Sequence, residues 1–181
     1  DWVFEKLPNV KEVVICDSLE EVVKGADIVH SGVSGPSGSA GYPHIRTEWL
    51  KPGAFVCSVA NLKLDDELLK DPATGLFIDN VQMYHDWQEE YEYPVYETIG
   101  IIGCRFVDLV HDNLVPATSL VNIGDVALGT KPGRTSDDQI IVFSVGGMPI
   151  EDIAWGSEVY RTAKAQGIGV ELPLWSVPAL A

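Results

Sequence analysis

The sequence of 181 residues predicts an α/β fold built on a parallel sheet. Short apolar segments alternate with short stretches of helical pattern, and most of these segments carry apolar residues on both faces. Parallel strands have this composition because helices cover both sides of their sheet. The length is close to that of one domain, and an apolar fraction of 46% is enough for a hydrophobic core.

The first two expected strands are residues 10–16 and 26–30, with a short helix between them. The helix should begin after Ser18, which opens an S-x-x-E capping box, and should end at Gly25. The second strand runs directly into residues 31–41, which are so rich in glycine and serine that they predict a loop.

Three more apolar strands are expected, at residues 54–59, 76–79 and 139–145. The last helix is the clearest, because its apolar residues recur at three- and four-residue steps between Pro149 at the N1 position and a C′ glycine, Gly167. Other helical patterns follow Pro43 and lie at residues 64–70, 99–110 and 120–128, and a turn-rich link is expected at 129–138.

Residues 84–96 interrupt the alternation of strands and helices. They carry four tyrosines, Trp87 and several acidic side chains, and Pro94 breaks any helix there. We therefore expect an excursion over the surface.

The charge excludes some classes of partner. Twelve Lys and Arg against 27 Asp and Glu give a net charge of −15, which repels a polyphosphate or an anionic membrane, so neither nucleic acid nor a membrane is expected. Cys16, Cys57 and Cys104 are odd in number, widely spaced and next to apolar stretches. They are expected to be buried free thiols, which favours a reducing, cytoplasmic location.

The start of the sequence suggests a piece of a longer chain or a processed product. It reads Asp-Trp-Val-Phe, and methionine occurs only at positions 83 and 148, so it resembles neither an initiator nor a signal peptide. We expect functional residues upstream of Asp1.

Three junctions at the ends of expected strands are candidate binding positions: Ser31-Gly32-Val33, Val59-Ala60-Asn61 and Gly146-Gly147. In open parallel sheets, ligands bind outside the carboxyl ends of the strands, where backbone N–H groups are accessible. The first two junctions should form one crevice, and the third could face an anion or a polar cofactor edge at a helix N-terminus.

Each junction also has a plainer interpretation. The glycine- and serine-rich loop can be a flexible connector, and Gly146-Gly147 can be a tight strand-to-helix turn. For Asp65, Asp66 and Glu67, which follow the second junction, we prefer the interpretation that they favour the N-terminus of the helix they open. Neither G-x-G-x-x-G nor G-K-[ST] is present, so the sequence contains no dinucleotide fingerprint and no P-loop.

Metal and triad chemistry has weaker support. The four histidines, His30, His44, His85 and His111, lack the spacing of metal ligands, and no G-x-S-x-G elbow surrounds Ser31, Ser34 or Ser144. A carboxylate-rich metal hydrolase built on Asp65, Asp79 and Asp86 remains the weakest alternative. We interpret Asp79 and Asp86 as strand-end and surface carboxylates.

Several strings spread over nearly the whole sequence carry a resemblance to a known family. They are residues 17–29, Leu50-Lys51-Pro52-Gly53-Ala54, Ile123-Gly124-Asp125-Val126-Ala127-Leu128-Gly129, Pro132-Gly133-Arg134, Ser136-Asp137-Asp138, Phe143-Ser144-Val145-Gly146-Gly147 and Ile150-Glu151-Asp152. In their residues and their order, these strings resemble the ornithine cyclodeaminase/mu-crystallin family.

The resemblance implies that residues 1–148 form the second half of a Rossmann-like NAD(P)-binding domain. Residues 149–181 would be a C-terminal helix and tail that return to a substrate-binding and dimerisation domain. The family's G-x-G-x-x-G and the residues that hold the substrate carboxylate would lie upstream of Asp1. The implied cofactor is NAD or NADP, the implied substrate a small amino or imino acid, and the implied partner a second copy or a chain that supplies the N-terminal half.

Matched residue by residue, Ser31-Gly32-Val33 correspond to a strand end against the cofactor and Val59-Ala60-Asn61 to one near the nicotinamide. Gly147 matches the glycine before the last helix. Two departures stand out: Val145 replaces a family serine, and the short loop after Asn61 contains no counterpart of the cyclodeaminase catalytic Asp. The catalytic residues are therefore unassigned.

These observations predict an NAD(P)-dependent oxidoreductase that transfers hydride at the α-carbon of an amino or imino acid. The alternative is a protein of the mu-crystallin type, which binds the cofactor but has weak or no catalysis. The two departures favour this alternative.

Overall fold

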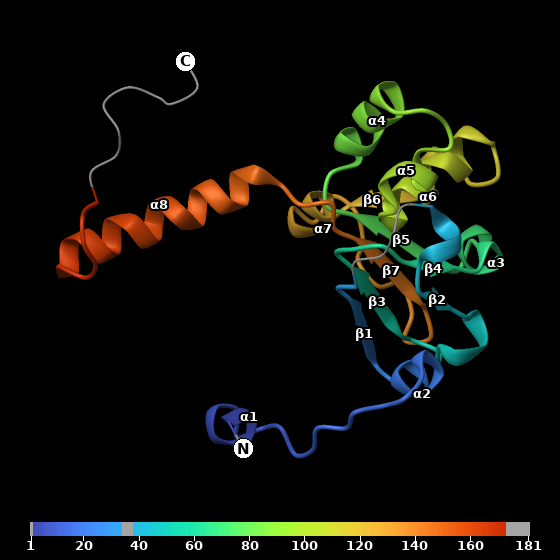
Figure 1. Ribbon diagram of the computed structural model, residues 1–181. Helices are drawn as coiled ribbons and strands as arrows, with labels where there is room; N and C mark the ends of the chain where they lie inside the picture. Colours follow the sequence, from blue (N-terminus) through green and yellow to red (C-terminus); the bar gives the residue numbers. More distant parts are fainter. Residues whose placement is uncertain (1, 34–37, 173–181) are drawn as a thin grey trace. The chain divides into compact units, whose positions relative to one another are not determined.

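Five parallel strands form the central sheet of the computed structural model, which describes residues 2–33 and 38–172 (Figure 1). Each neighbouring pair in the sheet is parallel, so the prediction of an α/β fold on a parallel sheet is confirmed. The order across the sheet is β1 (Ile28–Ser31), β3 (Phe55–Ser58), β7 (Ile141–Ser144), β5 (Gly75–Ile78) and β6 (Leu120–Asn122).

The last strand in sequence, β7, lies between β3 and β5. Its Val142 and the neighbouring Val56 of β3 are fully buried, as expected for strands covered on both faces. A second, two-stranded parallel sheet pairs β2 (His44–Ile45) with β4 (Lys63–Leu64).

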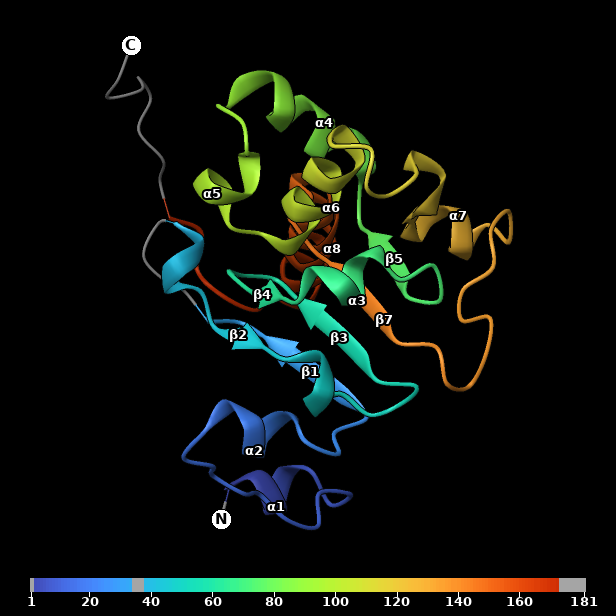
Figure 2. The same cartoon turned by 90° about the vertical axis from the view of Figure 1, so that its right-hand side faces the viewer.

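Helices α4 (Val81–Glu90), α5 (Val95–Ile99) and α6 (Ile102–His111) lie together on one side of the sheet in both views (Figures 1 and 2). Helix α6 contributes most to the core, because most of its side chains are buried and it contacts β7. The other helical elements of this part are α1 (Trp2–Lys6), α2 (Leu19–Val23), α3 (Asp66–Lys70), α7 (Ile123–Ala127) and the 3₁₀ turns η1 (Ser39–Gly41), η2 (Thr47–Trp49) and η3 (Ala117–Ser119).

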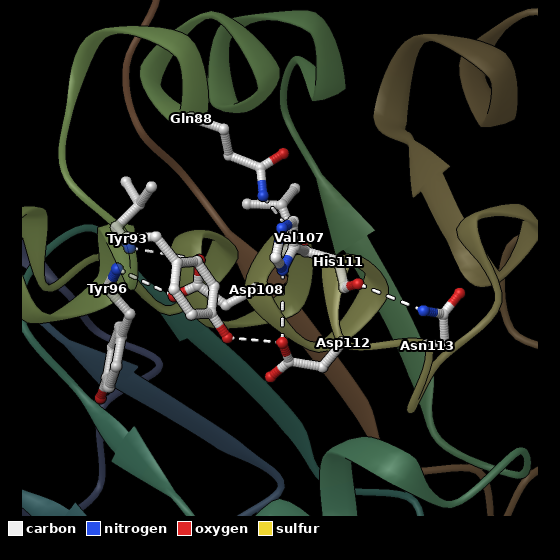
Figure 3. Close-up of polar contacts among 9 residues, drawn as sticks. Gln88, Tyr93, Tyr96, Val107, Asp108, His111, Asp112 and Asn113 are labelled. Atoms are coloured by element: carbon white, nitrogen blue, oxygen red, sulfur yellow. Dashed lines mark hydrogen bonds and ion pairs between the residues drawn. The ribbon is translucent and has the colours of Figure 1, made fainter.

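Polar contacts attach α4 and α5 to α6 (Figure 3). The carboxylate of Asp108, a buried residue of α6, accepts the backbone N–H groups of Val95 at 3.2 Å and Tyr96 at 3.0 Å. These N–H groups belong to the first turn of α5 and have no partner within that helix. The amide of Gln88 donates to the carbonyl oxygen of Val107 and joins α4 to α6.

The capping box at the start of α2 is confirmed. Ser18 Oγ accepts the N–H of Glu21 at 3.2 Å, and the Glu21 carboxylate accepts the N–H of Asp17 at 3.0 Å. Ser18 thereby satisfies a backbone donor that the first turn of α2 leaves unpaired, while Glu21 binds the N–H of the residue before the N-cap.

Two predicted elements are wrong. Residues 10–16 form no strand and are largely exposed, with Ile15 93% exposed, because nothing among the described residues pairs with them. A β-branched apolar run needs a neighbouring strand to become one. Residues 120–128 are not one helix, because buried Leu120 begins β6, which pairs with β5 before α7 starts.

The expected surface excursion at residues 84–96 is only partly correct: residues 85–94 are exposed or half-buried and no helix passes through Pro94, but the two ends of the segment belong to the core. Helix α4 runs through most of it, and Tyr84, Val95 and Tyr96 are buried. Tyrosines can occupy a core when the hydroxyl finds a partner, and the Tyr96 hydroxyl donates to the carbonyl oxygen of Leu62 at 2.5 Å.

None of the three cysteines, all of which lie in the described residues, forms a disulfide. Burial was predicted for all three, but only Cys104 is buried, while Cys16 and Cys57 are partly exposed. Burial raises the pKa of both Cys57 and Cys104, so these thiols stay protonated.

Contacts divide the chain into two units, Asp1–Gly147 and Met148–Ala181. In the second unit, α8 (Pro149–Gln166) begins with proline and ends at Gly167 in the left-handed conformation, as predicted. The N–H of Ile168 donates to the carbonyl of Ala163 at 2.9 Å and closes the helix end. None of the helices that the structure describes is long and apolar enough to cross a membrane.

Candidate functional site

The three predicted strand-end junctions lie at the same edge of the central sheet, the one formed by the carboxyl ends of the strands. Ser31 pairs with Ser58, and Ser58 pairs with Ser144, so buried serines form a row across β1, β3 and β7. The N–H of Val59 donates to the carbonyl of Ser31 at 3.0 Å, and that of Val145 donates to Ser58 at 2.9 Å. The junctions therefore start side by side at the carboxyl ends of three adjacent strands.

The first junction is open on its outer side. Gly32 and Val33 are exposed, and among the described residues a Cβ on Gly32 would meet only His30 Nε2, at 3.7 Å. The packing of the described residues thus does not require a glycine at this position and leaves its backbone open on this side. Residues 34–37 of the glycine- and serine-rich loop lie outside the described residues.

Contacts within the chain fix the backbone of the second junction. Ser58 Oγ donates to the carbonyl of Ala60 at 2.8 Å, and Asn61 forms a bridge with Ile101. Gly100, at φ +75°, lies so close to the Asn61 amide that any side chain there would collide with it. Val59 is 46% exposed and is the apolar side chain that this junction offers to a ligand.

The third junction is a tight turn held by Asp79. Asp79 Oδ2 accepts the N–H groups of Gly146 at 2.8 Å and Gly147 at 2.9 Å, and Oδ1 accepts that of Asn80 at 2.9 Å. Asp79 directly follows β5 and is only 9% exposed, which agrees with its interpretation as a strand-end carboxylate. The N–H groups that were expected to face an external anion are engaged by this carboxylate.

Ser144 connects this turn to two helices. Its hydroxyl accepts the N–H of Gly103 in α6 at 2.9 Å and shares a hydrogen bond of 2.9 Å with the Tyr84 hydroxyl of α4. Burial is the main cause that raises the pKa of Tyr84, so the phenol stays protonated. A Cβ on Gly146 would collide with side chains of α4, among them Trp87. The turn therefore fits closely against α4.

The charged segment after the second junction opens α3, as preferred above, but its carboxylates have other partners. Asp65 accepts the backbone N–H of Thr47 at 2.8 Å and the Thr47 hydroxyl at 3.0 Å, and pairs with His44 Nε2 at 2.7 Å. Burial opposes the charge of Asp65, but these hydrogen bonds outweigh it and lower the pKa of the carboxyl. Asp66 binds the guanidinium of Arg105 through two hydrogen bonds.

These charged residues surround a cavity of about 330 Å³ that Lys63 and Glu97 also line. The lining residues include none of the three junctions, so this cavity is separate from the predicted binding positions. The three carboxylates of the hydrolase alternative do not share a site. Asp65 binds His44 and Thr47, Asp79 binds the Gly146-Gly147 turn, and exposed Asp86 binds Gln82 at 2.8 Å. Within residues 2–33 and 38–172, no three His, Cys, Asp or Glu side chains are grouped to hold a metal ion.

Sequence reasoning missed the roles of Asp79, Tyr84 and Ser144. The available signal was the position of Asp79, directly after a buried strand and thus at the same sheet edge as the other strand ends. Ser144 is the last residue of β7 and pairs with Ile78, the residue before Asp79. Nothing in the local sequence of Tyr84 indicates that its hydroxyl reaches Ser144.

The model of the ornithine cyclodeaminase/mu-crystallin family matches residues 4–167. The chain is 25% identical over 172 residues to N-((2S)-2-amino-2-carboxyethyl)-L-glutamate dehydrogenase of Staphylococcus aureus, a match that covers 94% of this chain and 45% of that protein. It is 26% identical over 140 residues to alanine dehydrogenase of Archaeoglobus fulgidus, covering 75% of this chain and 38% of that protein. The chain thus spans less than half the length of these curated relatives.

Solved structures share the fold. An archaeal alanine dehydrogenase dimer with bound NAD superposes with a TM-score of 0.60 at 21% identity, covering 88% of this chain and 44% of that one. A Thermococcus litoralis Δ1-pyrroline-2-carboxylate reductase in complex with NADH and L-proline gives 0.62 at 18% identity, covering 87% and 44%.

Proposed function

Because the chain belongs to the ornithine cyclodeaminase/mu-crystallin family, we propose that it supplies half of the cofactor site of an NAD(P)-dependent oxidoreductase. The proposed reaction is hydride transfer at the α-carbon of a small amino or imino acid. The observation that carries this proposal is the alignment of Ser31, Ser58 and Ser144, which gathers three candidate junctions at one sheet edge.

The residues at this edge suit the nicotinamide end of a dinucleotide. A bound nicotinamide would supply the acceptor and donor of hydride. Gly32 leaves room for a flat ring to approach the backbone, and exposed Val59 offers an apolar contact. The described edge has no glycine-rich turn with unpaired N–H groups for a pyrophosphate, because Asp79 engages those of Gly146 and Gly147. The phosphate-binding turn would come from the upstream half.

The substrate class is inferred from the relatives. The names of the two curated relatives and of the two solved structures refer to amino acids or to a cyclic imine of one. We propose a substrate of this class, held partly by residues outside the chain, and an assembly that is either a homodimer or a complex with a chain that supplies the N-terminal half.

A cofactor-binding protein with weak or no catalysis is the second candidate. The sequence has no carboxylate between Asn61 and Asp65, and the first one after the junction, Asp65, is bound to His44 and Thr47. The loop after Asn61 therefore has no carboxylate of its own, and the first one that follows is engaged within the chain, which favours this second candidate.

A turnover assay separates the two candidates. The purified assembly, whose subunits are first weighed by native mass spectrometry, is incubated with NAD⁺ or NADP⁺ and a panel of amino acids. The reverse direction uses keto acids with ammonia or an amine, and reduced cofactor. Turnover of any member supports the oxidoreductase. Binding of the cofactor without redox change supports the second candidate, and absence of binding contradicts both.

A further inference from the structure

The turn at Gly146-Gly147 has the geometry of an anion site. Its two successive N–H groups converge on one point, and Gly147 has a φ of +90°, which favours glycine. Such converging N–H groups bind phosphate and other anions in many proteins. Here the anion is part of the chain, because the carboxylate of Asp79 occupies that point.

The carboxylate is fixed from several sides. Its second oxygen accepts the N–H of Asn80 at 2.9 Å, and the N–H of Asp79 itself donates to the carbonyl of Ser144 at 3.2 Å. Side chains of α4 crowd Gly146 from the other side. Asp79 and the turn therefore form one rigid unit that joins the ends of β5 and β7.

An occupied anion site changes what the turn can contact. With both N–H groups engaged and a negative charge behind them, the turn repels a phosphate and offers only uncharged backbone to a ligand. Among the parts of a dinucleotide, the two nucleosides carry no phosphate charge of the linking pyrophosphate and suit such a surface, and the proposed function assigns this sheet edge to the nicotinamide one.

We propose that Asp79 is a positioning residue, which fills the anion site of the Gly146-Gly147 turn and holds the turn in the shape that contacts the nicotinamide riboside end of the cofactor, the end without a phosphate. This proposal rests on the proposed function. Asp79 itself does not touch the reacting atoms.

The test compares Asp79→Ala and Asp79→Asn with a matched control, Asp86→Asn, in the purified assembly. Asp86 lies nearby in sequence, is exposed and carries the same charge, but binds Gln82 rather than the turn. Amide exchange at Gly146 and Gly147 is followed by NMR, cofactor dissociation constants are measured, and both are repeated with added formate or inorganic phosphate.

The proposal predicts that amide exchange of both glycines rises at least about tenfold in Asp79→Ala, and that cofactor affinity falls by about tenfold, since two charge-assisted hydrogen bonds are lost. Formate should shift the two amide resonances and restore part of the affinity in Asp79→Ala alone. Asp79→Asn, which keeps one acceptor oxygen, should lie between Asp79→Ala and the wild type, and Asp86→Asn should match the wild type.

Three results would overturn the proposal: unchanged glycine exchange in Asp79→Ala, a response of the wild-type glycine amides to phosphate, or a folded Asp79→Ala that formate does not rescue. If Asp79→Ala fails to fold, Asp79→Asn takes its place. Wild-type values of both glycine exchange and cofactor affinity in Asp79→Asn would then overturn the proposal. The glycine amides report on the anion site even when the wild type binds no cofactor, a result that would contradict only the proposed function.

Discussion

The backbone N–H of Val59 donates to the carbonyl oxygen of Ser31 across 3.0 Å, one step beyond the last paired residues of β1 and β3. This bond makes the two junctions neighbours, although 28 residues separate them (59 − 31). A similar bond between Val145 and Ser58 adds the third junction. The proposed cofactor edge is thus a direct result of parallel strand register.

Gly32→Val tests whether the first junction contacts the cofactor. The new side chain meets ordinary contacts within the chain, so the protein should keep its unfolding temperature to within a few degrees. If the backbone of Gly32 lies against the cofactor, affinity should fall by tenfold or more, on the order of 1.4 kcal/mol. Isothermal titration with NAD⁺ and NADP⁺ measures this.

Gly124→Val is the matched control for that experiment. Among the described residues, nothing lies within 4 Å of a Cβ placed on Gly124. This glycine lies in α7, which follows β6, and β6 and β1 are the two outermost strands of the sheet. Its replacement should leave affinity unchanged. Equal affinity for Gly32→Val and the wild type would place the cofactor elsewhere.

Gly103→Ala should destabilise the fold by about 2–3 kcal/mol, because it forces an extra methyl group into a packed core. The new methyl would collide with the Tyr84 ring and the Ser144 hydroxyl. Urea unfolding measures the loss. Gly156→Ala in α8 is the control, because no described atom lies within 4 Å of a Cβ at this position, and it should stabilise its helix by about 0.5–1 kcal/mol. Similar effects of the two changes would contradict the close packing around Ser144.

The sequence predicts elements whose signals are local, but not contacts between residues that are far apart in the chain. Strand β7 and helix α8 were found from local patterns, since their apolar residues and caps lie within the elements themselves. The partner of Asp79 could not be found in this way, because Gly146 is 67 residues away and only the insertion of β7 beside β5 brings them together. The prediction of a strand at residues 10–16 was wrong for a related reason: the local pattern favours a strand, but a strand also needs a neighbouring strand to pair with.

Asp65→Asn should lower stability at neutral pH by about 1–2 kcal/mol, because the side chain loses its charge and one of its acceptor oxygens for Thr47 and His44. The folded state lowers the pKa of Asp65, so its stabilisation is present above the unfolded pKa of about 3.9 and disappears as the pH falls through the folded value. Unfolding curves of the wild type and the variant should therefore converge below about pH 4.

Asp86→Asn is the control for this pH series, because Asp86 is exposed and bound only to Gln82 among the contacts described. Its difference from the wild type should stay small at all pH values. A difference between Asp65→Asn and the wild type that persists unchanged at acid pH would show that charge is not its cause.

Asp108→Ala should cost about 2–4 kcal/mol, because it leaves the buried N–H groups of Val95 and Tyr96 without an acceptor. Thermal unfolding measures this loss. Asp112→Ala removes a nearby carboxylate that binds the Tyr93 hydroxyl (Figure 3) at an exposed position, and it should cost clearly less than Asp108→Ala. Equal losses would contradict the capping of α5 by Asp108.

Hydrogen–deuterium exchange of the purified assembly with and without NAD⁺ or NADP⁺ tests the cofactor edge most directly. The account predicts slower exchange in peptides that contain Gly32, Val59-Ala60-Asn61 and Gly147, together with upstream segments of the assembly. Peptides around the charged cavity near His44 and Arg105 should not change. Cofactor binding that leaves all three junctions unprotected, or protects the charged cavity instead, would contradict it.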